Sequence, residues 1–228
     1  MNNIYAVNII GFANDRIKNV LLKYISEERK EKIKKFKNDM DGLRSLLSEA
    51  MIRYILIRYY NIENDSIRIK YNHYGKPYIE KYENIHYNIS HAGEWVVCAV
   101  HDSPVGIDIE KIQIIDIKIA KRFFAPTEYE YIKSSQDYDT LKRFYDIWTL
   151  KESFLKALGC GLSKPLNSFS ITIDDYDIKL KNGDQVQDFY FKMFDIEKIY
   201  KLSICSSTNN FPEEIDFIKG DELLKAFC

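Results

Sequence analysis

The segment Val105-Gly106-Ile107-Asp108-Ile109-Glu110 decides how this chain is interpreted. Apolar side chains alternate here with Gly106, Asp108 and Glu110, and this period of two predicts a β-strand. The two carboxylates therefore lie on one face of the strand. A strand that ends in Asp-x-Glu is usually a solvated edge, so the segment indicates a site only if a second element meets that face.

The second element is the stretch Trp148-Thr149-Leu150-Lys151-Glu152-Ser153-Phe154-Leu155-Lys156, which predicts a helix. Glu152 and Lys156 are four residues apart and share a face, an arrangement that is ordinarily a surface ion pair. If this face meets the acidic face of the strand, three carboxylates and a lysine surround one point. Oxygen donors that leave coordination positions open suit Mg²⁺, and the lysine would then hold a phosphate.

A third segment, Asn88-Ile89-Ser90-His91-Ala92-Gly93-Glu94-Trp95, places His91 between two strand-like stretches, residues 85–89 and 95–100. A lone histidine in a loop is more often structural than functional. The three segments gain meaning from their order along one chain.

In this order the segments resemble the phosphopantetheinyl transferases, specifically the long, surfactin-synthetase-activating type. The motifs that carry the resemblance are Gly75-Lys76-Pro77, Asn88-Ile89-Ser90-His91, Gly106-Ile107-Asp108-Ile109-Glu110, Arg122-Phe123-Phe124-Ala125-Pro126-Thr127-Glu128-Tyr129 and residues 148–156 followed by Gly161-Leu162-Ser163. They run from about residue 26 to residue 170. The central positions show no departure from the pattern.

The resemblance implies an enzyme that transfers 4'-phosphopantetheine from coenzyme A to a serine of an apo acyl or peptidyl carrier protein. Adenosine 3',5'-bisphosphate is the second product. Whether the carrier serves fatty-acid, polyketide or nonribosomal-peptide (antibiotic) synthesis does not follow from these residues. Two alternatives stay open: a non-catalytic module that binds coenzyme A or carrier proteins, and another Mg²⁺-dependent transferase acting on a nucleotide pyrophosphate.

The resemblance also implies roles for the acids. Asp108, Glu110 and Glu152 would bind Mg²⁺, while Lys156 and His91 would contact the pyrophosphate. The general base that takes the serine proton is either Glu152 or Glu128, and it must lie within about 3 Å of the hydroxyl or act through one water. Glu128 can equally be a first-turn helix residue stabilised by the helix dipole.

Coenzyme A carries a ribose 3'-phosphate and an adenine, which require a basic pocket. Matching positions imply Arg29, Lys32, Arg44 and Ser45 for the phosphate, and Lys76 with Ser90 near the adenine. The lysines around Lys32 can instead form a solvated helix face. Residues 111–124 are one candidate for an apolar, basic-rimmed surface that docks an acidic carrier protein, or else an ordinary core helix.

Composition excludes several other classes. The 228 residues carry a formal net charge of -1, so nucleic acid is not an expected partner. The four cysteines, Cys98, Cys160, Cys205 and Cys228, are too sparse for a disulfide framework and suit a reducing cytoplasm. No basic leader or membrane-length apolar run occurs, so we expect a cytoplasmic protein with no membrane association.

Patterns along the chain predict an α+β protein. Strands are expected at residues 4–10, 66–71, 85–89, 95–100, 105–110, 169–173, 178–180, 189–195 and 200–206, with a hairpin turn at Asn182-Gly183. Helices are expected after Ser26, from residue 39 or 41 to 60, at 115–123 and 127–133, and at 138–158, where Gly159 and Gly161 end the helix.

The two halves of the chain share an order, a long helix followed by several strands. Together with the resemblance, this predicts two similar α/β halves about a pseudo-twofold axis, residues 1–112 and 113–228, which cross over at 112–117. The active site would lie between the halves. Because one chain holds both, we expect a monomer.

Overall fold

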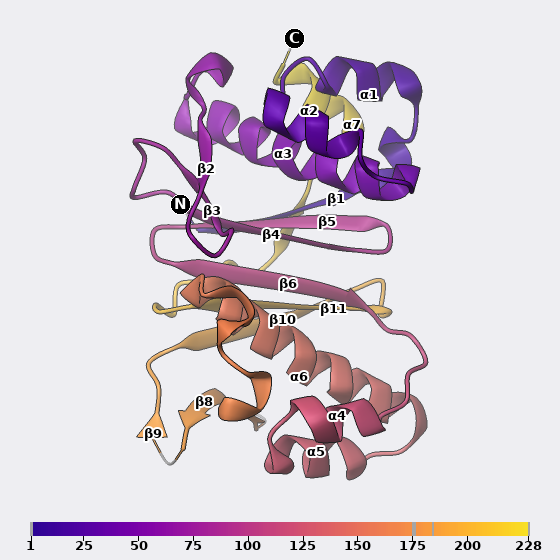
Figure 1. Ribbon diagram of the computed structural model, residues 1–228, viewed down its shortest axis with the longest axis vertical. Helices are drawn as coiled ribbons and strands as arrows, with labels where there is room; N and C mark the ends of the chain where they lie inside the picture. Colours follow the sequence, from indigo (N-terminus) through magenta and orange to yellow (C-terminus); the bar gives the residue numbers. More distant parts are fainter. Residues whose placement is uncertain (1, 175–176, 184, 228) are drawn as a thin grey trace.

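The computed structural model describes residues 2–174, 177–183 and 185–227 of the chain. Two β-sheets lie in the middle of the molecule, and helices cover the outer side of each sheet (Figure 1). This architecture confirms the predicted α+β class.

The first sheet has the strand order β12-β1-β5-β4. Its strands are β1 (Asn3–Asn8), β4 (His86–Ala92), β5 (Trp95–His101) and β12 (Ile215–Phe217), and β1 is antiparallel to β5 but parallel to β12. The helices on its outer side are α1 (Asp15–Leu21), α2 (Glu27–Ile33), α3 (Asp39–Tyr60) and α7 (Gly220–Lys225). Leu47, Met51 and Ile55 of α3 pack with Tyr87 and Val96 of the sheet in one buried core.

The second sheet has the order β10-β11-β6 and is antiparallel. Its strands are β6 (Val105–Lys111), β10 (Tyr190–Ile196) and β11 (Tyr200–Ser206), and its helices are α4 (Lys118–Phe123), α5 (Pro126–Lys133) and α6 (Asp137–Leu158). Two small sheets pair β2 (Ile69–Tyr71) with β3 (Pro77–Ile79), and β7 (Ser170–Ile173) with β8 (Ile178–Asn182) and β9 (Gln185–Val186). The apolar faces of the two large sheets share a core that includes Ile4, Val97, Ile107 and Ile204.

Local signals set the bounds of the helices that position the site. Ser26 caps α2 by accepting a hydrogen bond from the Arg29 amide, as its position predicts. The long helices α3 and α6 end at left-handed residues, Asn61 (φ 55°) and Gly159 (φ 66°). The predictions for both long helices and for the turn at Asn182-Gly183, which joins β8 to β9, are confirmed.

Three predicted elements are shorter than expected. The strand predicted at 4–10 stops at Asn8, because this side chain accepts from the Ile10 amide and starts a 3₁₀ turn (Ile9–Phe12). The strand predicted at 66–71 is reduced to Ile69–Tyr71, since a 3₁₀ turn occupies Asn64–Ser66. The helix predicted at 115–123 begins at Lys118.

The sequence analysis missed α1, α7, β3, β9 and β12. Two of these, β12 and α7, belong to the last residues of the chain and pack on the first half of the molecule. Ile4 pairs with Ile215, and the Tyr54 hydroxyl donates to Glu222 at 2.6 Å. The division into residues 1–112 and 113–228 stays a prediction, and the end of the chain crosses back over it.

Candidate active site

The strand β6 presents its acidic face to α6. Asp108 and Glu110 lie on the face opposite the apolar side chains of Ile107 and Ile109, as the alternation predicts. Gly106 on the same face touches the α6 backbone so closely that a Cβ atom there would overlap the Ser153 carbonyl oxygen and the Ala157 nitrogen. The absence of a side chain at residue 106 lets the acids of β6 approach the helix that carries Glu152 and Lys156.

Asp108 is at the centre of the site and is almost fully buried, with 4% of its surface exposed. Its Oδ1 accepts hydrogen bonds from the Ser90 hydroxyl at 2.9 Å and from Lys156 Nζ at 2.6 Å. Lys156 Nζ also donates to Ser90 Oγ at 3.0 Å and to the Ile107 carbonyl at 3.2 Å. Three of the predicted site residues, from β4, β6 and α6, thus form one hydrogen-bonded group.

Burial and the charge of this hydrogen-bonded group shift the pKa values of the other two acids, Glu110 and Glu152. Burial, followed by repulsion from Asp108, raises the pKa of Glu110 to about 7, and the Trp148 side chain donates a hydrogen bond to the Glu110 carboxylate. Burial and then repulsion from Asp108 also raise the pKa of Glu152. The three carboxylates therefore share one region in which negative charge exceeds the charge of Lys156.

Within the part of the chain that the structure describes, no three acidic, histidine or cysteine side chains are gathered at metal-binding distance. The donor set nevertheless fits a divalent cation. Asp108 Oδ2 is buried and has no hydrogen-bond partner, an arrangement that is costly for a carboxylate oxygen. An unpaired oxygen beside two carboxylates of raised pKa is the environment that a hard cation stabilises.

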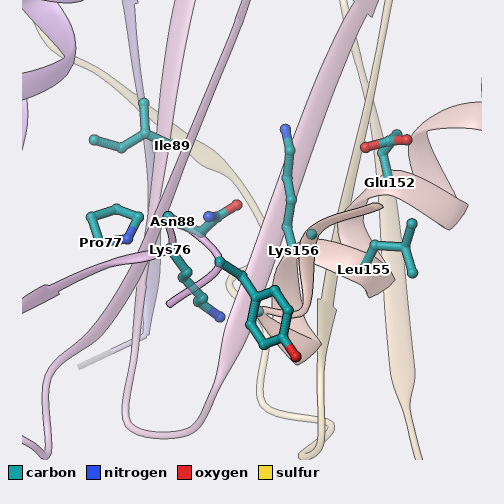
Figure 2. Close-up of a pocket in the computed structure, with 11 residues that line it drawn as sticks. Lys76, Pro77, Asn88, Ile89, Glu152, Leu155 and Lys156 are labelled. Carbon is teal, nitrogen blue, oxygen red and sulfur yellow. The ribbon is translucent and has the colours of Figure 1, made fainter. Parts of the chain in front are cut away.

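A pocket of about 310 Å³ lies beside this group and is called here the β4–α6 pocket. It is lined by Tyr74, Gly75, Lys76 and Pro77, by Asn88 and Ile89 of β4, by Glu152, Leu155 and Lys156 of α6, and by Gly159 and Gly161. Figure 2 shows Glu152 and Lys156 extending from α6, with Pro77 and Ile89 on the other side of the pocket.

Lys76, predicted to lie near an adenine, contributes to this pocket but its ammonium group is already engaged. Nζ donates to the Val105 carbonyl at 3.0 Å and to the Ala157 carbonyl at 2.9 Å. Burial lowers the pKa of Lys76 to about 8. The side chain thus joins the β2–β3 hairpin to β6 and to the end of α6.

His91 lies at the tip of the β4–β5 hairpin and is exposed. Partial desolvation, and then the charge of Arg44 with a smaller contribution from Lys156, lowers the pKa of His91. Arg44 does not point freely into solvent, because its Nε and Nη2 donate to the Gly93 carbonyl at 2.8 and 2.7 Å and its Nη1 donates to Asp41. Arg44 therefore fixes the hairpin that carries His91.

Arg29 and Ser45, predicted to lie together, are adjacent. Arg29 Nη1 donates to Ser45 Oγ at 3.2 Å, its Nη2 donates to the Tyr71 hydroxyl at 3.1 Å, and its Nε pairs with Glu49 at 3.2 Å. Lys32 is exposed on α2. The basic residues predicted for a phosphate thus occupy α2 and the first turns of α3.

Glu128 is placed by the structure outside this site, which argues against its predicted role as a general base. The side chain is 1% exposed and forms an ion pair with the equally buried Lys151 at 2.8 Å. Its oxygens also accept from the Ala125 amide and the Ile171 amide, both at 2.7 Å. A carboxylate with these partners stabilises the contact of α5 with α6 and β7 and is not accessible to a substrate hydroxyl.

Sequence analysis did not assign a role to two residues that contact the site. Asn88 Oδ1 accepts a hydrogen bond from the Ile107 amide at 2.9 Å, and Trp148 donates to Glu110. Both stand in motifs already singled out, but their partners come from other strands and helices. No spacing within one segment could have predicted these contacts.

A second hollow, called here the α4–α6 groove, borders Glu110. It has a volume of about 630 Å³ and is lined by Glu110, Ile115, Asp116, Lys118, Ile119, Arg122, Phe123, Phe144, Tyr145 and Trp148. Ile119 and Phe123 are 43% and 36% exposed, respectively. The groove is therefore an apolar surface with basic groups from α4, next to the acids of β6.

Comparison with known proteins gives a consistent result. Residues 104–205 match the family described as the 4'-phosphopantetheinyl transferase superfamily, and residues 15–103 match the family described as 4'-phosphopantetheinyl transferase, N-terminal. The chain is 38% identical to the 4'-phosphopantetheinyl transferase Sfp of Bacillus subtilis, over 89% of this chain and 91% of that protein. It is 40% identical to the 4'-phosphopantetheinyl transferase gsp of Aneurinibacillus migulanus, over 82% of this chain and 78% of that protein.

Among solved structures, the holo-[acyl-carrier-protein] synthase of Thermotoga maritima aligns with a TM-score of 0.38 and 19% identity, over 45% of this chain and 61% of that protein.

Proposed function

Because the chain belongs to the 4'-phosphopantetheinyl transferase superfamily, we propose a role for each group of residues around Asp108 in the reaction of that family. The protein is an enzyme that transfers 4'-phosphopantetheine from coenzyme A to a carrier protein. The observation that carries the proposal is the buried, half-paired carboxylate of Asp108, whose ion-pair partner Lys156 lines the β4–α6 pocket.

Asp108, Glu110 and Glu152 would hold Mg²⁺, which when bound neutralises the pyrophosphate of coenzyme A and polarises its phosphorus–oxygen bonds. Lys156 would move its ammonium group from Asp108 to a phosphate oxygen. Its present hydrogen bonds are to Ser90 and Asp108, and its side chain already lines the pocket. His91, neutral because its pKa is lowered, would donate an N–H to the same pyrophosphate.

In the transfer, the carrier serine oxygen bonds to the phosphorus on the pantetheine side of the pyrophosphate. The bond from that phosphorus to the bridging oxygen breaks, and adenosine 3',5'-bisphosphate leaves. We propose that Glu152 takes the serine proton, directly or through one water, because its side chain lines the β4–α6 pocket next to Lys156. Glu128 is not part of this step, since all its oxygen contacts lie within the protein core.

The pocket residues would hold the rest of coenzyme A. The β4–α6 pocket, with Lys76 and Pro77 on one side and Ser90 nearby, suits the adenine. Arg29, Lys32 and Ser45 would bind the ribose 3'-phosphate. Arg44 would contribute its remaining donors and its charge, because three of its N–H groups are used by Gly93 and Asp41.

We propose that the carrier protein docks in the α4–α6 groove, since this groove borders Glu110 and combines apolar side chains with Lys118 and Arg122. Carrier domains that serve fatty-acid or nonribosomal-peptide synthesis would both suit such a surface. A monomer is the expected state, because residues of both halves already meet at Asp108 within one chain. No helix of the described residues has the length and hydropathy of a membrane span. A cytoplasmic location, suggested by the sparse cysteines, remains part of the proposal.

Intact mass spectrometry of an apo carrier protein, incubated with the enzyme and coenzyme A, tests the proposal. We expect Mg²⁺-dependent addition of one phosphopantetheine group, which Asp108→Asn and Glu152→Gln both abolish. The matched control is Asp102→Asn, since Asp102 is an exposed acid at the start of the turn before β6. Full activity of Asp108→Asn, or activity unaffected by a chelator, would refute the metal and residue roles.

A further inference from the structure

The free edge of β6 is where the two large sheets meet. β6 ends the order β10-β11-β6, and β4 ends the order β12-β1-β5-β4, so each is an edge strand. The Ile112 amide, just after β6, donates to the carbonyl of Ile199, the residue before β11. Main-chain groups in an antiparallel ladder alternate between the two sides of a strand. Odd-numbered residues of β6 therefore direct their N–H and C=O groups away from β11, toward β4.

Side chains, and not the main chain of a neighbouring strand, form the hydrogen bonds to these main-chain groups. Lys76 Nζ donates to the Val105 carbonyl at 3.0 Å, Asn88 Oδ1 accepts from the Ile107 amide at 2.9 Å, and Lys156 Nζ donates to the Ile107 carbonyl at 3.2 Å. All three side chains also line the β4–α6 pocket. The edge of β6 and the wall of the pocket are thus built from the same residues.

Asn88 differs from the two lysines because it belongs to β4 itself. It is 6% exposed, and Ser90 lies two residues further along β4 on the same face. Asn88 contacts Ile107 while Ser90 contacts Asp108 at 2.9 Å, so two successive links join β4 to β6. The first link holds the strands at the distance and register that the second one needs.

We propose that Asn88 is a positioning residue of the transfer reaction, an inference that rests on the proposed function. Its amide oxygen replaces the main-chain acceptor that a paired strand would offer to the Ile107 N–H. It thereby keeps the Ser90 hydroxyl on Asp108. Asn88 acts through Ser90 and Asp108 and does not itself take part in bond making.

An amide suits this position better than a carboxylate. Asp at residue 88 would accept the Ile107 N–H equally well, but it would add a fourth carboxylate beside Asp108, Glu110 and Glu152. Repulsion among like charges would then raise the pKa values of the acids further. Asn88→Asp therefore keeps the acceptor of the link and replaces the amide nitrogen with a charged oxygen, whereas Asn88→Ala removes the link.

The experiment measures kcat and the KM for coenzyme A together with the exchange rate of the Ile107 amide proton. In Asn88→Ala we expect faster Ile107 exchange and a loss of about tenfold or more in kcat, because small displacements of catalytic groups are costly, with KM changed less than about threefold. Asn88→Asp should keep the exchange protection of Ile107. Asn64→Ala is the control, since the Asn64 side chain likewise forms hydrogen bonds across the fold, to Arg53 and Tyr24, but lies outside the pocket.

A double-mutant cycle with Ser90→Ala decides the mechanism. If Asn88 acts through Ser90, the loss in kcat of the double variant is smaller than the product of the two single losses. Independent, multiplicative losses, an effect confined to KM, or unchanged Ile107 exchange in Asn88→Ala would each overturn the inference. If Asn88→Ala does not fold, the exchange rate in Asn88→Asp provides the test, and an unprotected Ile107 amide there overturns the inference.

The activity of Asp108→Ala separates this inference from the proposed function. If Asp108→Ala is active, the proposed function fails. If Asp108→Ala is inactive while Asn88→Ala has wild-type kcat, only the present inference fails.

Discussion

Gly106 gives the most direct test of how the two halves of the site are held together. An alanine Cβ at this position would overlap the Ser153 oxygen and the Ala157 nitrogen and would lie 2.9 Å from the Lys156 carbonyl carbon. All three are main-chain atoms of α6, so no side-chain rotation can relieve the overlap. Gly106→Ala must therefore move α6 away from β6.

The size of the movement follows from the contact distances. Ordinary contact with a Cβ atom begins at 3.4 Å, so the Lys156 carbon alone requires a shift of 0.5 Å (3.4 minus 2.9), and the two closer atoms require more. Catalytic groups must be held within about 0.5 Å of their productive positions. Because Glu152 and Lys156 travel with α6, we expect kcat/KM to fall about 100-fold. Overpacking should also lower the free energy of unfolding by about 1–3 kcal/mol.

Both quantities can be measured on the same protein preparation, by carrier modification followed with intact mass spectrometry and by urea denaturation. Gly11→Ala is the matched control, since no atom lies within 4 Å of an added Cβ there. Wild-type kcat/KM and wild-type stability in Gly106→Ala would refute the argument that close contact of β6 with α6 positions the catalytic acids. Equal losses in Gly11→Ala would also refute it.

Three further predictions concern charge. Burial lowers the pKa of Lys76 to about 8. Between pH 8 and 10.5 the folded state has therefore lost a proton that the unfolded state still holds. The free energy of unfolding of the wild type should rise by up to about 3 kcal/mol over this range. Urea titrations of Lys76→Met should lack this rise, and an equal rise in the variant would contradict the assignment. Glu128→Gln leaves the Lys151 ammonium buried without a counter-charge and should cost about 3–5 kcal/mol, while activity per folded molecule is retained; a loss below about 1 kcal/mol would show that the pair is not coupled. Because burial raises the pKa of Glu110 to about 7, the metal-free protein should lose stability as pH rises from about 4.5 to 7, since the folded state holds a proton that the unfolded state has lost. Mg²⁺ should then raise the melting temperature more at pH 8 than at pH 6, and equal shifts at both pH values would count against carboxylate ligands.

The elements that the sequence predicts well are those whose signal is local. Alternation over residues 105–110 predicts β6, and helical periodicity with a terminal Gly159 predicts α6. The strand β12 has only three residues and exists because it pairs with β1, about 210 residues earlier in the chain. No periodicity within residues 215–217 could indicate this. The helix α1 is different, because Asn14 caps it by accepting from the Arg16 amide and was a usable signal.

The residues of the site also differ in whether a local sequence signal predicts them. Residue type and spacing predict that Asp108, Glu110, Glu152 and Lys156 share a region, and the mutual effects on their pKa values agree with this. The partners of individual atoms depend on tertiary packing. Glu128 looks like a candidate base in the sequence because its buried partner, Lys151, lies 23 residues away on another helix.

Three acids in the described part of the chain are buried. Their hydrogen bonds distinguish two structural carboxylates from the one in the proposed active site. Glu49 binds Arg29, Arg53 and both the amide and hydroxyl of Ser26, so both its oxygens are satisfied. Glu128 is likewise satisfied on both oxygens. Asp108 alone keeps an oxygen with no partner. Since an unsatisfied buried carboxylate oxygen costs stability, its retention is explained if a cation or substrate supplies the missing contact during the reaction.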